Sequence, residues 1–223
     1  MRSIIKKEFT LSNEEQEILA RACRIKKFKY AETIYNEDDD WTNYYYLING
    51  NIEITKLYGD REVPFYKGRG RFFPNFSQNE DLCCERVTVA SKIATVLVIK
   101  HDVMEKLVRA GKEFCNLVWD DIIEELDFLK SLSQEIGNRN KLEALDRTCR
   151  LYAIFIDEKD KHGHYELPRS LNQEKLSKIL GTTRVTVNKK IKELRQKRVL
   201  LQKERNMRIA NKAIEEFKNF LWR

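Results

Sequence analysis

The stretch LNQEKLSKILGTTRVTVNKKIKEL, residues 171–194, decides how the second half of this 223-residue chain folds. Its apolar residues recur at three- and four-residue steps on both sides of Gly181, a pattern typical of two short amphipathic helices. Gly181 suits the left-handed position that follows the first helix, while Asn172 and Thr183 are favourable N-cap residues for the two helices. The spacing therefore predicts a helix-turn-helix.

Flanking segments extend this motif into a larger module. Residues 197–203 and 207–210 surround a short polar turn and predict a basic hairpin, or wing. Amphipathic patterns predict one helix over about 141–157 and a closing helix over 211–221. We therefore expect residues 138–223 to form a winged helix-turn-helix domain.

The charge of the chain divides at the same place. Residues 138–223 carry 22 Lys and Arg against 11 Asp and Glu, a net charge of +11, whereas residues 1–137 carry 20 against 24, a net charge of −4. A basic segment on an otherwise mildly acidic chain favours a polyanionic partner, most often nucleic acid. Double-stranded DNA is the expected partner, and a solvated basic face without a partner is the alternative.

The first half begins with a predicted helix over 12–22 and then changes to short β-rich segments. Between about residues 26 and 100, alternating runs are separated by turn signals such as Asn49-Gly50-Asn51. Many short strands at close spacing predict a β-barrel or jelly roll within residues 1–110. The fold class is thus α+β with more than one domain.

Residues 111–137 predict a single long helix, with Gly137 and Asn138 as a hinge to the second half. Its length and its near-heptad apolar stripe favour packing against a second copy of the chain, and packing on its own domain is the alternative. The residues expected at this dimer interface are Cys115, Val118, Trp119, Ile122, Leu126, Leu129, Leu132 and Ile136.

A β-roll, a long helix and a winged helix-turn-helix in this order resemble the Crp/Fnr family of bacterial transcription regulators. The resemblance covers nearly the whole chain, and it is strong over residues 171–200 and pattern-level over 25–110. It implies a cyclic-nucleotide-binding-like sensor domain, a homodimer formed through the long helix, and a C-terminal DNA reader without catalytic activity. RNA polymerase is a further partner that the resemblance allows.

The resemblance also places the DNA-binding residues. The base-reading positions fall on Arg184, Val185, Asn188 and Lys189, and many family members carry glutamate where this chain has Val185. A valine can only touch a thymine methyl group, so the operator should differ from the best-known family sites. The full set expected at DNA is Asn172, Gln173, Thr182, Thr183, Arg184, Val185, Thr186, Asn188, Lys189, Lys203, Arg205 and Arg208.

The sensor half departs from the family at the residues that hold a cyclic nucleotide. Family members that bind one open the phosphate cassette with Gly-Glu and close it with Arg-Ser/Thr-Ala. In this chain Pro74-Asn75 stands where the cassette opens, and the segment CCERVT, residues 83–88, stands where it closes. We expect no cAMP binding, and control by another effector, by a redox signal or by none. An effector is expected near Phe72, Phe73, Arg86 and Trp119.

The remaining composition narrows the function classes. Five scattered cysteines, three histidines and no CxxC pair indicate neither a disulfide framework nor a metal site, and no cofactor is expected. Adjacent Cys83 and Cys84 are ordinary thiols or a redox pair. A cupin-like metalloenzyme is not expected because the β region has no histidine before His101, and a cupin-like small-molecule-binding module remains the alternative to a DNA-binding regulator. The lack of a membrane-length apolar run or a signal-like N-terminus predicts a cytoplasmic protein.

Overall fold

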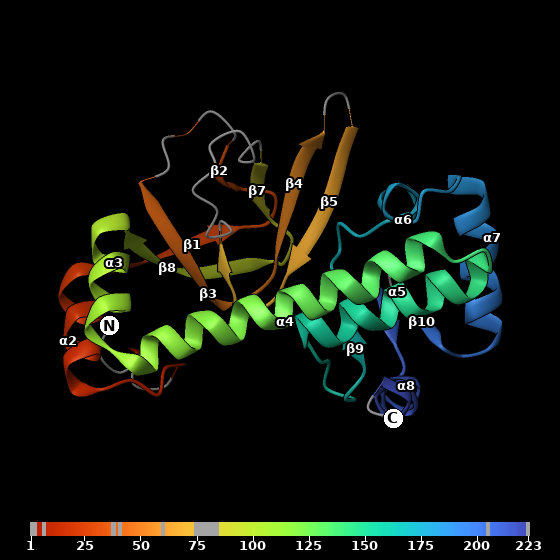
Figure 1. Ribbon diagram of the computed structural model, residues 1–223. Coiled ribbons are helices and arrows are strands. Elements are labelled where there is room, and N and C mark those ends of the chain that lie inside the picture. The colour runs from red at the N-terminus through yellow and green to blue at the C-terminus, as the bar shows by residue number, and fades with distance from the viewer. Residues whose placement is uncertain are drawn as a thin grey trace.

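The computed structural model describes residues 4–5, 8–36, 39, 42–58, 61–73, 85–203 and 206–221. Along the chain, a β-sandwich is followed by a long helix and then by a helical domain with a small sheet (Figure 1). In these residues, no helix combines the length and the apolar character that a membrane span requires.

The sandwich consists of two four-stranded antiparallel sheets, ordered β1-β8-β3-β6 and β2-β7-β4-β5. This arrangement confirms the expected jelly-roll class. Gly50 forms the predicted turn between β3 and β4 with a φ of +92°, and a Cβ atom there would lie 2.5 Å from the carbonyl oxygen of Ile93. The strands are β1 Arg24–Lys29, β2 Thr33–Tyr35, β3 Asn43–Asn49, β4 Ile52–Tyr58, β5 Arg61–Lys67, β6 Phe72–Phe73, β7 Glu85–Val89 and β8 Ile93–Lys100.

Apolar side chains fill the space between the two sheets. The rings of Tyr35, Tyr45 and Phe73 stack on one another with centroid distances of 5.2 to 6.4 Å. Leucine, isoleucine and valine residues from both sheets complete this buried cluster. An apolar core thus holds the two sheets together.

The end of the sandwich nearest the N-terminus is closed by helices. Helix α2, Asn13–Ala22, begins with a capping box in which Ser12 and Glu15 bond to each other's backbone N–H groups. The carboxylate of Glu15 also accepts a 2.8 Å bond from the backbone N–H of Phe114. Helix α3, His101–Ala110, leads into α4, Lys112–Gly137, so the start of the long helix is fixed against α2.

Helix α4 has 26 residues, which corresponds to about 39 Å, and passes along the sandwich toward the C-terminal domain (Figure 1). Its inward face mixes apolar and acidic residues: Phe114, Val118, Asp121, Phe128, Leu132 and Glu135 are buried.

The buried acids of α4 are paired with bases from distant parts of the chain. Lys67, fully buried on β5, bonds to Glu125 at 2.6 Å, and Arg71 bonds to Asp121 at 3.2 Å. Burial raises the pKa of Asp121, while the nearby Lys67 and Arg71 act in the opposite direction. These pairs attach α4 to its own β-sandwich.

Helix α5, Lys141–Ile156, turns back beside α4 and starts the C-terminal domain (Figure 1). The predicted helices and the wing strands follow at nearly the expected positions, together with β9, which was not predicted. They are β9 Tyr165–Glu166, α6 Gln173–Ile179, α7 Arg184–Gln196, β10 Leu200–Lys203, β11 Asn206–Ile209 and α8 Asn211–Leu221, with the strands ordered β10-β11-β9.

The core of the C-terminal domain reaches past the expected boundary at residue 138. Phe128 of α4 stacks on Phe155 of α5 at 4.3 Å, and Tyr66 of β5 meets Tyr152 edge-on at 5.6 Å. The second half of α4 and one edge of the sandwich therefore share an apolar cluster with the helix-turn-helix.

Polar contacts join the same two parts of the chain. Lys175 of α6 bonds to the buried carboxylate of Glu53 on β4, and Asn51 donates a 2.7 Å bond to Glu158. The sandwich therefore contacts the helix-turn-helix through ion pairs and hydrogen bonds as well as through apolar packing.

Candidate nucleic-acid interface

Local hydrogen bonds shape the helix-turn-helix as its sequence predicts. The Asn172 side chain accepts a 3.0 Å bond from the backbone of Lys175, and Thr183 accepts a 3.1 Å bond from the backbone of Thr186. Gly181 adopts a φ of +55° after the C-cap of α6. The caps and the left-handed residue fix where α6 ends and where α7 begins.

Helix α7 separates its side chains into two faces. Val187, Ile191 and Leu194 are buried against the domain core. The predicted base-reading residues Arg184, Val185, Asn188 and Lys189 are all exposed, and Val185 is 79% exposed. An apolar side chain this accessible contributes little to packing within the described part of the chain. Lys192 lies one turn further along the exposed face and was not predicted.

The two helices are connected by a polar contact on the exposed side. Gln173 donates a 3.3 Å bond from Nε2 to Oδ1 of Asn188, which leaves the amide group of Asn188 free to donate. Thr183 and Thr186 share a 2.9 Å contact between hydroxyl groups, while Thr182 lies half-buried in the turn.

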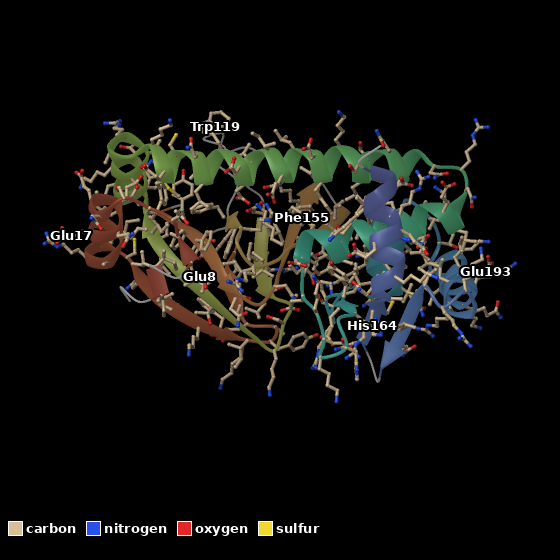
Figure 2. The ribbon with its side chains drawn as sticks, turned by 90° about the horizontal axis from the view of Figure 1, so that it is seen from below. Glu8, Glu17, Trp119, Phe155, His164 and Glu193 are labelled. Carbon is tan, nitrogen blue, oxygen red and sulfur yellow. The ribbon has the colours of Figure 1, made fainter. Side chains whose placement is uncertain are left out.

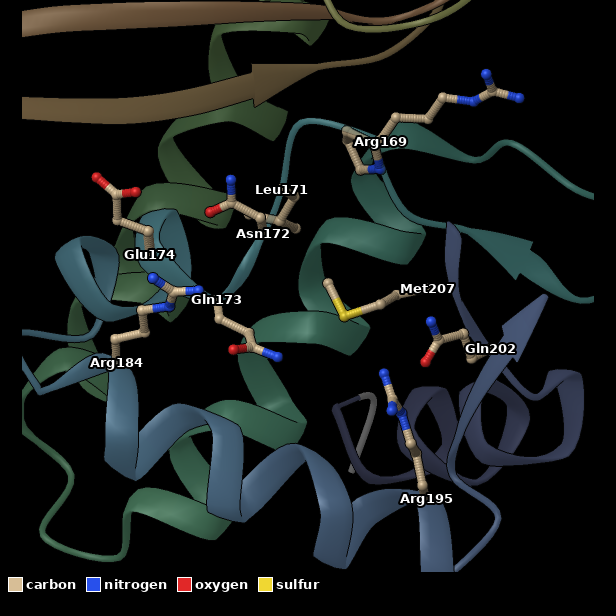
Figure 3. Close-up of a pocket in the computed structure, with 10 residues that line it drawn as sticks. Arg169, Leu171, Asn172, Gln173, Glu174, Arg184, Arg195, Gln202 and Met207 are labelled. Atoms are coloured by element: carbon tan, nitrogen blue, oxygen red, sulfur yellow. The ribbon is translucent and has the colours of Figure 1, made fainter. Parts of the chain in front are cut away.

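A hollow of about 290 Å³ opens between the start of α6, the start of α7 and the wing (Figure 3). Asn172, Gln173 and Arg184 line it, so the structure brings together three of the predicted residues. Arg169 and Arg195 line it as well, and the Nε of Arg195 is buried without a hydrogen-bond partner among the described residues. Neither arginine was predicted: Arg169 precedes the motif, and Arg195 lies in the last turn of α7, where the sequence gives no sign that it borders the hollow.

The wing corrects one expectation. Arg208 was expected at a DNA phosphate, but its guanidinium bonds to Asp160 at 2.7 Å and to Glu166 at 2.6 Å, and only 13% of its side chain is exposed. A guanidinium held by two carboxylates is neutralised within its own domain, so Arg208 is a structural residue. Arg205 and the side chain of Lys203 lie outside the described residues.

The exposed face of α4 differs in part from the expected dimer stripe. Trp119, Leu126, Leu129 and Ile136 are exposed, and Cys115 and Ile122 are partly exposed. Figure 2 shows Trp119 on the side of α4 away from the rest of the chain. Val118 and Leu132 instead point inward and are buried, so including them in the stripe was wrong. Ile123, which is 52% exposed, was missed.

The four residues expected around an effector are not brought together. Phe72 and Phe73 are buried core residues, and Trp119 lies on the opposite side of α4 from the sandwich (Figure 2). Arg86 faces outward and pairs with Glu62 at 3.4 Å, so it cannot serve as a hook inside the roll. The grouping was wrong because the alternation of β7 places Glu85, and not Arg86, in the interior.

Glu85 is the buried charge that faces the inside of the sandwich. Its carboxylate bonds to the hydroxyl of Tyr35 and lies 3.8 Å from the amine of Lys56. The predicted departures from the cyclic-nucleotide cassette, Pro74-Asn75 and Cys83-Cys84, lie outside the described residues.

Residues 149–214 match the Crp-like helix-turn-helix domain family. The HTH-type transcriptional regulator ArcR of Staphylococcus epidermidis is 21% identical over 193 residues, which cover 84% of this chain and 82% of that protein. ArcR of Staphylococcus aureus is 20% identical, with 84% and 80% covered.

Solved structures agree in fold. A cyclic nucleotide-binding domain containing protein from Listeria monocytogenes superposes with a TM-score of 0.68 at 16% identity, covering 87% of this chain and 92% of that one. FixK2 from Bradyrhizobium japonicum gives 0.69 at 17% identity, covering 89% and 96%. The curated relatives are named as transcription regulators and not as enzymes, in agreement with the expectation of no catalytic activity. The β-sandwich, the long helix and the helix-turn-helix thus give this chain the fold of these structures, and its residues 149–214 match the Crp-like helix-turn-helix domain family.

Proposed function

We propose that this chain is a homodimeric transcription regulator that binds a palindromic DNA operator through α7. The observation that carries the proposal is the exposed face of α7, where Arg184, Val185, Asn188 and Lys189 stand free on a helix fixed by Thr183 and Gly181. A helix held in this way presents its first two turns to the major groove.

The chemistry of each exposed residue suits a different base edge. Arg184 and Lys189 donate to guanine or to phosphate, and Asn188 pairs with adenine through its amide. Val185 favours a thymine methyl group at the position it faces. The operator half-site therefore contains a thymine where family members with glutamate select cytosine.

Contacts to phosphate hold the helix in register. Asn172, Gln173, Thr182 and Thr183 lie at the entrance to α7, where short polar side chains and backbone N–H groups meet the DNA backbone. Arg169 and Arg195 add positive charge on the wing side of the hollow (Figure 3). These contacts are independent of sequence and make binding sensitive to salt.

The exposed stripe of α4 forms the dimer seam in this proposal. Cys115, Trp119, Ile122, Leu126, Leu129 and Ile136 follow four- and three-residue steps, as the seam of a coiled coil does. An exposed stripe of this length is costly in water unless another surface covers it. A two-fold axis along α4 then sets the two half-sites about 34–36 Å apart.

The signal that controls the regulator is not cAMP. Arg86 points outward to Glu62, and the buried carboxylate of Glu85 faces the inside of the sandwich, where it would disfavour an anionic phosphate. The regulator then responds to another effector or to a redox signal at Cys83 and Cys84, or it acts without any signal. A cupin-like small-molecule-binding module that does not use DNA is the second candidate, and the free face of α7 argues against it.

Selection from a random DNA pool tests the proposal. The wild type should enrich an inverted repeat, and Arg184→Ala should lose its preference at one base pair in each half-site. Enrichment of no sequence by the wild type, with normal folding shown by circular dichroism, would contradict the proposed function.

A further inference from the structure

A second hollow, of about 320 Å³, lies at the junction between the β-sandwich and the C-terminal domain. Its walls come from the β3–β4 and β7–β8 turns on one side and from residues 158 and 166–169 on the other. The volume is at the lower end of the range for small-molecule sites, about 300–1,000 Å³. The hollow shares Pro168 and Arg169 with the hollow beside α7 and is otherwise lined by different residues.

Asn51, which lines this hollow, carries a buried polar atom that lacks a partner among the described residues. The side chain of Asn51 is 2% exposed, and it is the Oδ1 of this side chain that accepts no hydrogen bond from them. The orientation of the amide is fixed because Nδ2 donates to the carboxylate of Glu158 at 2.7 Å, and a reversed amide would place two acceptors together. Hydrogen bonds to Ser91 and Ala90 hold the backbone of Asn51. A buried carbonyl oxygen in this position needs a donor.

Negative charge lies at the inner wall of the hollow, and positive charge lies at its rim. Glu158 lies beside Asn51 at the inner wall, where burial and the neighbouring Glu166 raise its pKa. The carboxylate of Glu166 is paired with Arg208, so Glu158 is the acid of this wall without a cationic partner among the described residues. Lys92 and Arg169 line the same hollow and are exposed, so they form a basic rim.

We propose that this junction hollow binds a small amino carboxylate, with its protonated amine toward Asn51 Oδ1 and Glu158 and its carboxylate toward Lys92 and Arg169. An ammonium group supplies the missing donor to Asn51 and the missing cation to Glu158 at once. The side chains of Ile93, Leu167 and Pro168 provide an apolar wall for a short methylene chain between the two charged ends.

Arg169 links this site to the proposed function, because it lines both the junction hollow and the hollow beside α7. A ligand carboxylate that holds Arg169 competes with a DNA phosphate for the same guanidinium. Occupancy should therefore weaken DNA binding, and this consequence rests on the proposed function while the binding site does not.

Isothermal titration of the full-length chain without DNA tests the site. The probes are the unbranched amino carboxylates from glycine to 6-aminohexanoate, together with their N-acetyl derivatives, which lack the ammonium group. At least one amino carboxylate should bind at millimolar concentration or below, and its N-acetyl derivative should not. Absence of heat with every probe, or equal binding of the acetylated form, would overturn the proposal.

Two variants and a matched control test whether the amino carboxylate binds in this hollow. Glu158→Gln should weaken binding of the amino carboxylate roughly ten- to hundredfold, and Asn51→Leu should weaken it several-fold to tenfold. An ammonium group gains more from an ionised acceptor than from a neutral amide oxygen. Asp157→Asn removes the same charge one residue earlier, outside the hollow, and should leave the affinity unchanged. Thermal melts without ligand establish that each variant is folded, and equal affinity of the wild type and folded Glu158→Gln would place the ligand elsewhere.

The effect on DNA is measured separately. Adding the bound amino carboxylate to a titration with the selected operator should lower the affinity of the wild type for DNA. No change in DNA affinity, with binding intact in calorimetry, would overturn the competition for Arg169 and leave the site established. Failure of the wild type to bind any DNA would contradict the proposed function without affecting the calorimetric result.

Discussion

The exposed faces of α4 and α7 are alike in accessibility and opposite in chemistry. On α4, Trp119 and Leu126 are 58% and 59% exposed, and on α7 the accessible side chains are mainly Arg184, Asn188 and Lys189. Each helix buries its other face within the chain.

The difference between these faces indicates different partners. An apolar face gains free energy when any complementary apolar surface covers it, and a second copy of the same helix supplies one by symmetry. A basic, hydrogen-bonding face is well hydrated and gains chiefly from a polyanion whose counterions are released. Exposure shows that a helix face is accessible to a partner, and the chemistry of the exposed side chains indicates which class of partner it suits.

The largest effect is expected from a charge on the outer face of α4. Leu126→Asp should dissociate the dimer, because burial of a leucine contributes roughly 1.5–3 kcal/mol and a symmetric interface loses that contribution twice. Sedimentation velocity at micromolar concentration measures the change. Gln134→Asp, also exposed on α4, is the control that adds a charge outside the stripe. A monomeric wild type under these conditions would show that the apolar face has another partner.

The next largest effect is expected on the outer face of α7. Arg184→Ala and Asn188→Ala should each relax preference at one base pair per half-site, and each bidentate pair removed should reduce discrimination by roughly 1–3 kcal/mol. Competition binding with operators substituted at single positions measures this reduction. Lys212→Gln removes an exposed cation from α8 and should not alter base preference. Unchanged specificity in both α7 variants would mean that another element reads the bases.

The parts of the fold that sequence predicted well depend on neighbours close in the chain. The caps at Asn172 and Thr183 and the left-handed Gly181 each act within four residues, so their signals are complete in a short stretch of sequence. Alternating strands with an Asn-Gly turn likewise indicated the jelly roll.

The sequence of α4 alone could not show which of its residues face the rest of the chain and which face outward. Its inward positions, 114, 118, 121, 125, 128, 132 and 135, each precede an outward position, 115, 119, 122, 126, 129, 133 and 136. Both series follow four- and three-residue steps, and they lie about 100° apart on the helix. The inward series includes Asp121 and Glu125, whose partners Arg71 and Lys67 are at least 50 residues away. Polarity along the sequence therefore assigned Val118 and Leu132 to the wrong face.

The site residues that were misplaced share the same cause. Arg208 was expected to be free because Asp160 and Glu166 lie more than 40 residues before it in sequence. Arg86 was expected inside the roll, but a shift of one residue along a strand moves a side chain to the opposite face of the sheet. Arg169 was missed because only the tertiary fold brings it near α7, and Arg195 was missed because only the fold shows that the last turn of α7 borders the hollow.

A smaller effect is expected from the start of α7. Thr183→Ala removes the side chain that caps the helix and should lower the free energy of unfolding by about 1 kcal/mol. Thr183→Ser keeps an accepting hydroxyl and should retain most of the stability. Urea unfolding without DNA measures both variants, and equal stability of the alanine and serine forms would show that the cap is not what holds this end of α7.

The smallest effect is expected from removing single positive charges. It distinguishes side chains that are free to bind phosphate from those already paired with a carboxylate. Lys192→Gln should reduce DNA affinity only a few-fold at moderate salt. The slope of log affinity against log salt should flatten by about one unit for each phosphate that the variant no longer neutralises, which is one phosphate per half-site. Arg208→Gln should leave that slope unchanged, because its guanidinium is already neutralised by Asp160 and Glu166. Titrations of the operator at several salt concentrations give both slopes. A flatter slope in Arg208→Gln would mean that DNA displaces the two carboxylates and that the wing carries the charge contact instead of α7.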